Sequence, residues 1–228
     1  MLIPAAGMGT RLGAAGPKAL LDLRGEPMLV HTLRRFEPLG LLHNTVIVVH
    51  PDHEGAIAGA CVRAFPNSRF HFVPGGAERQ ESVLRGLDAL EPATEIVVVH
   101  DAARPFVQPD SIRKSIEAAA RHGAATVAIP SSDTILVADE DGFLADTPDR
   151  SRLWACQTPQ TFKVEVLRSA HEAARRNGDA VTDDATLVQR AGGRVELVMG
   201  SALNIKITVP DDAVLARVII EKGLAACE

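Results

Sequence analysis

The sequence predicts an α/β fold in which helices cover a mainly parallel β-sheet and a β-hairpin arm is inserted. Short β-branched runs alternate with segments whose apolar residues recur at helical spacing. One pair of alternating segments interrupts this order around an Asp-Gly turn. With 228 residues and 46% hydrophobic content, the chain is large enough for a single domain over residues 1–228.

The first half of the chain predicts alternating strands and helices. Runs of β-branched residues predict strands at residues 44–50, 69–73, 95–100 and 124–130. Apolar residues three and four positions apart predict helices at residues 27–36, 79–90 and 110–122. Because helices separate these strands along the chain, we expect the strands to run parallel.

The second half of the chain begins with the pair of alternating segments that interrupts the α/β pattern. Residues 131–151 contain two alternating segments joined at Asp141 and Gly142, which is a strong hairpin signal. A two-stranded hairpin is only marginally stable alone, so we expect 131–151 to be a dimerisation arm that packs on a second copy of the chain. The α/β pattern then returns, with a strand near 153–157, a helix at 164–176, a strand at 194–199 and a helix at 211–222.

Composition excludes several classes of partner. The net charge of −5 provides no general basic surface, which argues against nucleic acid as a partner. No apolar run is long enough to span a membrane, and the N-terminus does not resemble a signal peptide. Cys61, Cys156 and Cys227 are odd in number and far apart, which favours a reducing compartment. We therefore expect a cytoplasmic protein without a membrane partner.

The first eighteen residues carry the strongest chemical signal. A short apolar strand leads into a loop in which Gly7 and Gly9 can adopt positive φ and let a ligand approach the backbone. Arg11 and Lys18 follow, and their charges could stabilise a phosphorus centre during transfer. The loop therefore predicts nucleotide chemistry.

Two further strand ends carry polar or glycine-rich sequences. Gly75 and Gly76 precede Ser82 at the start of a predicted helix, where backbone groups and a hydroxyl could read a nucleobase, although a plain turn is the alternative. Asp101 and Arg104 follow the 95–100 strand, where they could hold a magnesium–phosphate complex or a sugar hydroxyl, or form a capping salt bridge. Since parallel strands end at one edge, all three loops could face one cleft.

Other polar clusters have simpler interpretations. Residues 50–53 contain two histidines, but Pro51 predicts a helix start rather than a metal site. The acidic residues 139–141 are expected at a hairpin tip, and residues 182–184 at a helix N-cap. Lys206 lies in an apolar run that predicts a strand, where a lysine needs an anionic partner or a path to solvent.

Six segments together resemble the 2-C-methyl-D-erythritol 4-phosphate cytidylyltransferase family over nearly the whole chain. They are IPAAGMGTRLG…PK, VPGGAERQESV, VHDAARPFV, LWACQTPQTF, VTDDATLVQRAG and LNIKITVPDD. The resemblance implies a Rossmann-like nucleotidyltransferase fold and a homodimer. It also implies transfer of the cytidylyl group from CTP to methylerythritol phosphate in the non-mevalonate isoprenoid pathway, with release of pyrophosphate and use of Mg²⁺ or another divalent cation.

The same resemblance implies roles for individual residues. Arg11 and Lys18 would stabilise the pentacoordinate α-phosphorus. Residues of the nucleotide site would be Pro4, Ala5, Ala6, Gly7, Gly9, Gly75, Gly76, Ser82, Asp101, Ala102 and Lys206. Residues of the acceptor site would be Arg104, Thr134, Arg150, Thr158 and Thr182, with Thr134 and Arg150 supplied by the arm of the partner subunit. Asp101 is also the candidate metal ligand, for an ion held mainly by phosphates.

The chain departs from the family pattern at Ala19, where glutamine is usual, and at Ala77, where an acidic residue can contact ribose. Three alternatives stay open: a cytidylyltransferase for another polyol phosphate such as ribitol 5-phosphate, a non-catalytic nucleotide-binding protein, and a nicotinamide oxidoreductase. The presence of both Arg11 and Lys18 favours turnover over mere binding.

Overall fold

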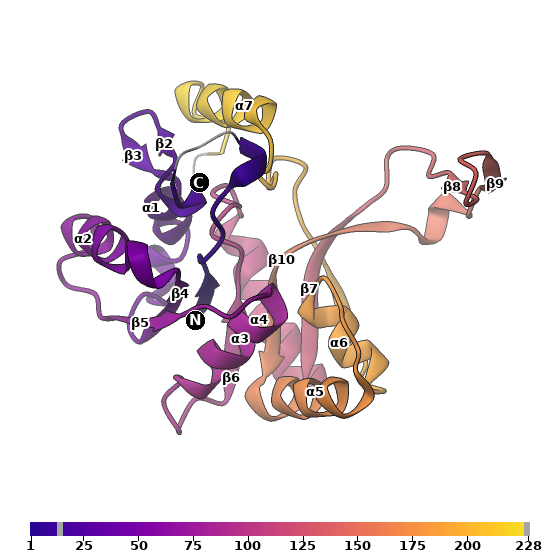
Figure 1. The fold of residues 1–228 in the computed structure, drawn as a ribbon, viewed down its shortest axis with the longest axis horizontal. Coiled ribbons are helices and arrows are strands. Elements are labelled where there is room, and N and C mark those ends of the chain that lie inside the picture. The colour runs from indigo at the N-terminus through magenta and orange to yellow at the C-terminus, as the bar shows by residue number, and fades with distance from the viewer. Residues whose placement is uncertain (13–15, 226–228) are drawn as a thin grey trace.

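The chain is described by a computed structural model that covers residues 1–12 and 16–225. Its centre is a seven-stranded sheet in the order β11-β7-β10-β6-β1-β4-β5 (Figure 1). These strands are β1 (Leu2–Pro4), β4 (Thr45–Val49), β5 (Phe70–Pro74), β6 (Ile96–Val99), β7 (Ala124–Pro130), β10 (Trp154–Lys163) and β11 (Glu196–Met199). Every pairing is parallel except those of β10, which confirms the mainly parallel sheet.

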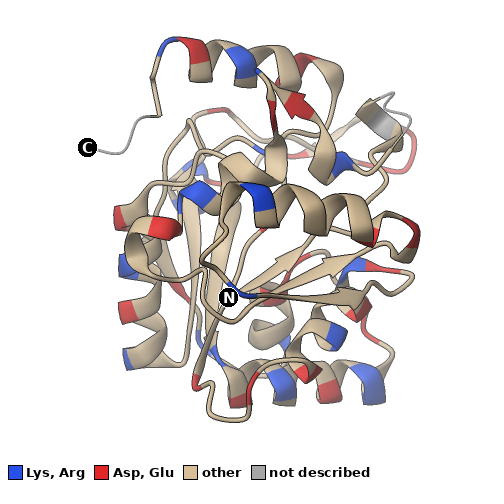
Figure 2. Ribbon diagram, turned by 90° about the vertical axis from the view of Figure 1, so that its left-hand side faces the viewer, with Lys and Arg blue, Asp and Glu red and all other residues tan. Residues whose placement is uncertain are grey.

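Helices cover both faces of the sheet. They are α1 (Met28–Arg34), α2 (Glu54–Ala64), α3 (Arg79–Asp88), α4 (Pro109–His122), α5 (Val164–Asn177), α6 (Asp184–Arg190) and α7 (Pro210–Glu221). Short 3₁₀ turns are η1 (Thr10–Leu12), η2 (Lys18–Leu20), η3 (Glu37–Leu39), η4 (Pro51–His53) and η5 (Arg150–Arg152). Figure 2 shows basic and acidic residues interspersed along the helices, whereas the strands seen in that view carry few.

Strand alternation divides the core into two layers. Ile3 of β1 faces a cluster that includes residues of α1, α2 and α4. Leu2 faces the opposite cluster, with residues of α3, α5 and α6. Successive side chains of a strand point to opposite faces, so one three-residue strand contributes to both layers.

The sequence predicts a strand that ends at residue 157, but β10 continues to Lys163. It runs antiparallel between β6 and β7, a position that buries Gln160 and Thr161. Their polar side chains hide the strand signal in the sequence. In the fold they are satisfied: Thr161 Oγ1 lies 2.8 Å from Ser115 Oγ, and Gln160 Oε1 accepts the Asp184 N–H at 2.9 Å.

The connection from β7 to β10 is the inserted arm, which projects from the rest of the molecule (Figure 1). It contains the antiparallel strands β8 (Val137–Ala138) and β9 (Leu144–Asp146), which confirms the predicted hairpin. Asp139 Oδ1 accepts the N–H groups of Asp141 and Phe143, and Gly142 adopts a φ of 85°. The acidic residues therefore form the hairpin tip, as expected.

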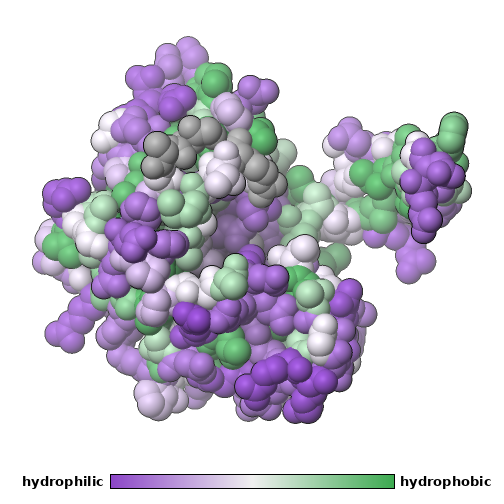
Figure 3. Space-filling view, in the orientation of Figure 1, coloured by the Kyte–Doolittle hydropathy of each residue, from purple (hydrophilic) through white to green (hydrophobic). Residues whose placement is uncertain are grey.

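The arm exposes an unusual amount of apolar surface. Leu136, Phe143 and Leu144 are 61%, 72% and 64% exposed, and Figure 3 shows hydrophobic side chains clustered on the arm. A short hairpin does not gain enough from burial to order this surface by itself.

The segment before α7 corrects one prediction, and it packs near an element that the sequence did not predict. Lys206 was expected in a strand, but residues 200–209 form no strand. The segment is held instead by single contacts such as the hydrogen bond that the Ile207 N–H donates to Ala103 O. Ile207 instead joins a small core beneath α7 with Leu23. Leu23 belongs to an unpredicted two-stranded hairpin, β2 (Asp22–Leu23) with β3 (Glu26–Pro27). Within the described residues, no helix has the length and apolar character needed to cross a membrane.

Candidate active site

Three loops at the carboxyl edge of the sheet meet around one cavity of about 430 Å³. They follow β1, β5 and β6, and the segment before α7 closes the fourth side. The structure thus brings the three predicted strand-end loops together. The predicted residues among the cavity's lining are Pro4, Ala5, Ala6, Gly7, Gly9, Lys18, Gly76, Ser82, Asp101, Ala102 and Lys206.

The glycine-rich loop turns back on itself after β1. Gly9 has a φ of 67°, and its C=O accepts the N–H of Leu12 at 2.8 Å. The Lys18 N–H then bonds to Gly7 O at 3.1 Å, which places Lys18 beside the start of the loop. A Cβ on Gly9 would lie 3.1 Å from the Lys18 Cβ, so glycine also permits this close approach. Gly7, in contrast, does not adopt a positive φ.

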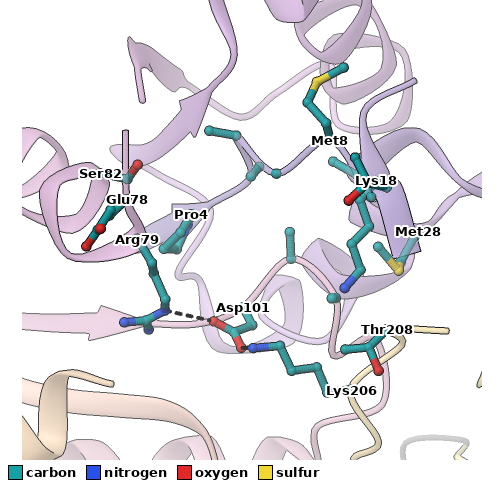
Figure 4. Close-up of a pocket in the computed structure, with 18 of the residues that line it drawn as sticks. Pro4, Met8, Lys18, Met28, Glu78, Arg79, Ser82, Asp101, Lys206 and Thr208 are labelled. Atoms are coloured by element: carbon teal, nitrogen blue, oxygen red, sulfur yellow. Dashed lines mark ion pairs between the residues drawn. The ribbon is translucent and has the colours of Figure 1, made fainter. Parts of the chain in front are cut away.

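The two predicted catalytic cations differ in what the structure describes. Lys18 begins η2, and its side chain extends into the cavity from the wall opposite Arg79 (Figure 4). Arg11 belongs to η1, directly after the glycine-rich turn, but its side chain lies outside the described part of the structure.

Asp101 is held between two cations on the floor of the cavity (Figure 4). Its Oδ2 lies 2.7 Å from Lys206 Nζ, and its Oδ1 lies 3.5 Å from Arg79 Nε. Burial alone would raise the pKa of the Asp101 carboxyl, but Arg79 and Lys206 outweigh it and hold that pKa well below its usual range. Asp101 is therefore a fixed anion at physiological pH.

A buried hydrogen-bond relay fixes the backbone that carries Asp101. The Asp101 N–H donates to Thr158 Oγ1 at 3.1 Å, and this hydroxyl lies 3.0 Å from His100 Nδ1. Burial lowers the pKa of His100 to about 4, so its ring is neutral and has one donor. Because His100 Nε2 lies 3.0 Å from the Arg104 carbonyl, Nε2 carries the proton and Nδ1 accepts from Thr158. Thr158, predicted at the acceptor site, supports the site from behind.

Arg104 also braces the cavity from outside its lining. Its guanidinium donates to Asn204 O at 2.8 Å and to Cys156 O at 3.1 Å. These bonds tie the loop after β6 to β10 and to the segment that carries Lys206. In this conformation, the Arg104 guanidinium donates both of these hydrogen bonds to backbone carbonyls of the protein.

The glycine pair after β5 is explained by close packing. A Cβ on Gly75 would lie 2.5 Å from Ala6 Cβ, so only glycine lets these two loops meet. Gly75 itself does not line the cavity, whereas Gly76 and Ser82 do. The Gly76 N–H donates to Ser82 Oγ at 3.0 Å, which leaves the hydroxyl proton of Ser82 able to donate elsewhere.

None of the five predicted acceptor-site residues lines the cavity in this chain, and three of them, besides Arg104 and Thr158, are exposed. Thr134 and Arg150 lie exposed on the arm, where Arg150 donates to Ser132 O at 3.1 Å. Thr182 is exposed just before α6. The next residue, Asp183, accepts the Thr186 N–H at 2.9 Å, which confirms the predicted helix N-cap.

Sequence reasoning did not assign a role to several residues of the lining. Arg79 is the most notable, because it pairs with Asp101 from the first turn of α3. Its place at the start of a predicted helix, three residues after a glycine pair, was the available signal. The others are Met8, Thr10, Ala19, Met28, Ala77, Glu78, Ala103 and Thr208.

The residues around the cavity fit a metal ion held mainly by its ligand. Within residues 1–12 and 16–225, no cluster of three or more His, Cys, Asp or Glu side chains forms a metal-binding group. Asp101 is a permanently ionised carboxylate on the cavity floor, and such oxygens suit Mg²⁺. A single protein carboxylate beside a polyphosphate is a common arrangement for this ion.

Comparisons with known proteins agree on one family. The family model described as IspD, 2-C-methyl-D-erythritol 4-phosphate cytidylyltransferase, matches residues 1–222. A protein of that name from Desulforamulus reducens is 42% identical over 228 residues, which cover 100% of this chain and 97% of the relative. Its namesake from Pelotomaculum thermopropionicum is 43% identical over 221 residues, covering 96% of this chain and 93% of the relative.

Solved structures give the same result. The 4-diphosphocytidyl-2C-methyl-D-erythritol synthase of Anaerococcus prevotii has a TM-score of 0.86 at 29% identity, covering 96% of this chain and 94% of that one. The 2-C-methyl-D-erythritol 4-phosphate cytidylyltransferase of Thermus thermophilus has a TM-score of 0.77 at 36% identity, covering 96% and 97%. With its sheet order, its strand-end cavity and these full-length matches, the chain belongs to the 2-C-methyl-D-erythritol 4-phosphate cytidylyltransferase family.

Proposed function

We propose that the cavity at the carboxyl edge of the sheet transfers the cytidylyl group from CTP to the phosphate of 2-C-methyl-D-erythritol 4-phosphate. The products are 4-diphosphocytidyl-2-C-methyl-D-erythritol and pyrophosphate. The observation that carries this assignment is a glycine-rich loop and Lys18 facing a fixed Asp101–Lys206 pair across one cavity. This arrangement suits a polyphosphate on one side and an incoming phosphate on the other.

The nucleotide half of the site comes from the loops after β1 and β5. The backbone from Pro4 to Gly9 borders the cavity and offers N–H groups to phosphate oxygens. Gly76 and Ser82 border the same cavity and offer backbone groups and a hydroxyl to a base. A cytosine has an exocyclic amine donor where uracil has an acceptor, so fixed groups here would favour CTP.

The chemistry needs no covalent nucleophile. The acceptor phosphate attacks the α-phosphorus of CTP, a P–O bond forms there, and the bond to the pyrophosphate leaving group breaks. Lys18 and Arg11 would stabilise the negative charge that builds on the phosphorus oxygens. The resemblance counts Lys206 with the nucleotide site; since its ammonium lies on the cavity floor beside Asp101, we propose that it also brings the acceptor phosphate close.

We propose that a divalent cation, Mg²⁺ in the cell, binds mainly to the phosphates of CTP and is met by the Asp101 carboxylate. When bound, the ion would neutralise phosphate charge as the transfer proceeds. Asp101 can serve it because the carboxyl remains ionised across physiological pH.

We also propose that residues 1–228 act as one domain and work as a homodimer through the arm of residues 131–151. The exposed apolar side chains of the arm provide the surface for this contact, and Thr134 and Arg150 would then enter the neighbour's acceptor site. The free thiols of Cys61 and Cys156 suit a cytoplasmic location.

The decisive test is an assay of pyrophosphate release from CTP with two acceptors, methylerythritol phosphate and ribitol 5-phosphate, and with UTP as a second nucleotide. We expect turnover with methylerythritol phosphate and CTP, and little with the other combinations. Faster turnover with ribitol phosphate would reassign the acceptor. Nucleotide binding without any release would show a non-catalytic protein, and binding of NAD instead of CTP would show an oxidoreductase.

A further inference from the structure

Behind the floor of the cavity lies a second carboxylate that lines no part of it. Asp184 is the first residue of α6, and its side chain is only 2% exposed. Its Oδ2 lies 2.8 Å from Arg79 Nη1, while Arg79 Nε lies 3.5 Å from Asp101 Oδ1. Arg79 thus bridges a buried anion and the anion of the active site.

The charges form an alternating row of four. Lys206, Asp101, Arg79 and Asp184 follow one another with N–O distances of 2.7, 3.5 and 2.8 Å. The row crosses four parts of the fold, from the segment before α7, through the loop after β6 and the first turn of α3, to the start of α6. Lys206, Asp101 and Arg79 all lie in the lining of the cavity, and Figure 4 shows the connections between them.

The surroundings of Asp184 leave Arg79 as its charged partner among the described residues. His171 Nε2 lies 3.9 Å from Asp184 Oδ1, but burial lowers the pKa of His171 to about 4, so this ring is neutral at pH 7. Burial raises the pKa of the Asp184 carboxyl, and Arg79 opposes that shift. The negative neighbours Asp101 and Asp183 raise the same pKa, so they do not stabilise the Asp184 carboxylate.

Asp184 is itself held in place from the sheet. Gln160 of β10 accepts the backbone N–H groups of Asp184 and Ala185 at 2.9 and 3.2 Å. Gln160 is fully buried, so the start of α6 is fixed relative to β10. A carboxylate fixed in this way can orient a long arginine side chain that would otherwise have many rotamers.

We propose that Asp184 is a positioning residue of the active site, which holds Arg79 and through it fixes the Asp101 carboxylate against Lys206. The proposal rests on the proposed function, because it explains how Asp101 and Lys206 are placed before substrates bind. Because Arg79 also forms an ion pair with Asp184, it attracts the Asp101 carboxylate less strongly, and Asp101 keeps its ion pair with Lys206.

The test is a double-mutant cycle of Asp184→Asn and Arg79→Gln, with kcat, KM for CTP and thermal unfolding measured for each protein. Asp184→Asn should lower kcat by about ten- to a hundredfold, as small displacements at a reacting centre do. In the Arg79→Gln background, the same change should lower kcat no further, because the group through which Asp184 acts is gone. Equal fold-losses in both backgrounds would overturn the proposal.

A matched control uses the neighbouring carboxylate. Asp183→Asn makes the same chemical change one residue earlier, keeps an N-cap acceptor, removes the negative charge at the N-terminus of the α6 dipole and leaves Arg79 untouched. It should lower the unfolding temperature slightly while kcat changes less than about threefold. If Asp183→Asn reduced kcat as much as Asp184→Asn, the effect would belong to the stability of α6 and the proposal would fail.

Stability gives an independent readout should Asp184→Asn alone not fold. Arg79→Gln leaves a buried carboxylate without its cation, which is destabilising. Adding Asp184→Asn should therefore raise the unfolding temperature of Arg79→Gln, and a further decrease would contradict the pairing. An inactive wild-type enzyme would refute the proposed function, whereas this comparison would still report on the pair.

Discussion

At the scale of single residues, Lys18 offers the most direct test of catalysis. Its ammonium extends into the cavity from η2, where charge would build on the α-phosphorus. Lys18→Ala should lower kcat by about 10²–10³ with a much smaller change in CTP affinity, because the charge matches the transition state better than the ground state. Arg11→Ala should behave likewise.

Steady-state kinetics and calorimetric CTP binding check this prediction. Lys114→Ala is the matched control, since Lys114 is exposed on the outer face of α4 and pairs with Asp110. Near-native turnover of Lys18→Ala would remove Lys18 from the mechanism.

Thr158 tests the buried relay behind Asp101. Thr158→Val removes the hydroxyl that accepts from the Asp101 N–H and donates to His100, and leaves both groups buried without partners. We expect a loss of about 1–3 kcal/mol in unfolding free energy together with reduced kcat. Thr158→Ser keeps the hydroxyl and should restore most of both. A serine variant as impaired as the valine variant would show that the methyl group matters, not the relay.

At the scale of elements, the loops after β1 and β5 are held together by the absence of a side chain. In Gly75→Ala, the new methyl group would lie 2.5 Å from Ala6 Cβ, so the two loops proposed to bind the nucleotide must separate. We expect a cost of about 1–3 kcal/mol in stability. We also expect CTP affinity to fall by about tenfold or more, as measured by calorimetry.

Gly55 provides the matched control. It lies in the first turn of α2, where an added Cβ meets nothing within 4 Å. Gly55→Ala should leave CTP binding unchanged and stabilise the helix by about 0.4–1 kcal/mol. Unchanged CTP affinity in Gly75→Ala would mean that the loops separate without affecting the site.

At the scale of the whole molecule, the arm predicts an active site shared between two subunits. Lys18 belongs to the body of the chain and Arg150 to the projecting arm. Lys18→Ala and Arg150→Ala subunits, each inactive alone, should therefore complement each other. With random exchange, half of the dimers are mixed and each has one intact site, so about a quarter of wild-type activity should return.

Subunit exchange is verified by native mass spectrometry before activity is measured. A mixture that stays inactive after verified exchange would show that the arm serves its own chain or no site at all. Ultracentrifugation of a variant with Phe143→Ser and Leu144→Ser provides a second check, because removing exposed apolar surface should weaken the dimer.

The sequence alone determined the features that depend on local patterns. The alternation of β-branched and amphipathic segments predicted most elements of the sheet and its helices, and the Asp-Gly turn predicted the arm. Residue types at the predicted strand ends indicated that the glycine-rich loop, Lys18 and Asp101 face one cleft, and the family resemblance added Lys206; all of them border the cavity. These features were readable because the chain order of parallel strands places their ends at one edge.

Only the tertiary structure decided which side chains work behind the cavity. β10 was predicted too short because Gln160 and Thr161 are polar, and their burial is satisfied by partners distant in sequence. Thr158 and Asp184 also have partners that are distant in sequence. Thr158 supports Asp101 from β10, and Asp184 pairs with Arg79 at the start of α3. A buried polar residue takes its role from the partners that folding brings to it, and no local pattern contains those partners.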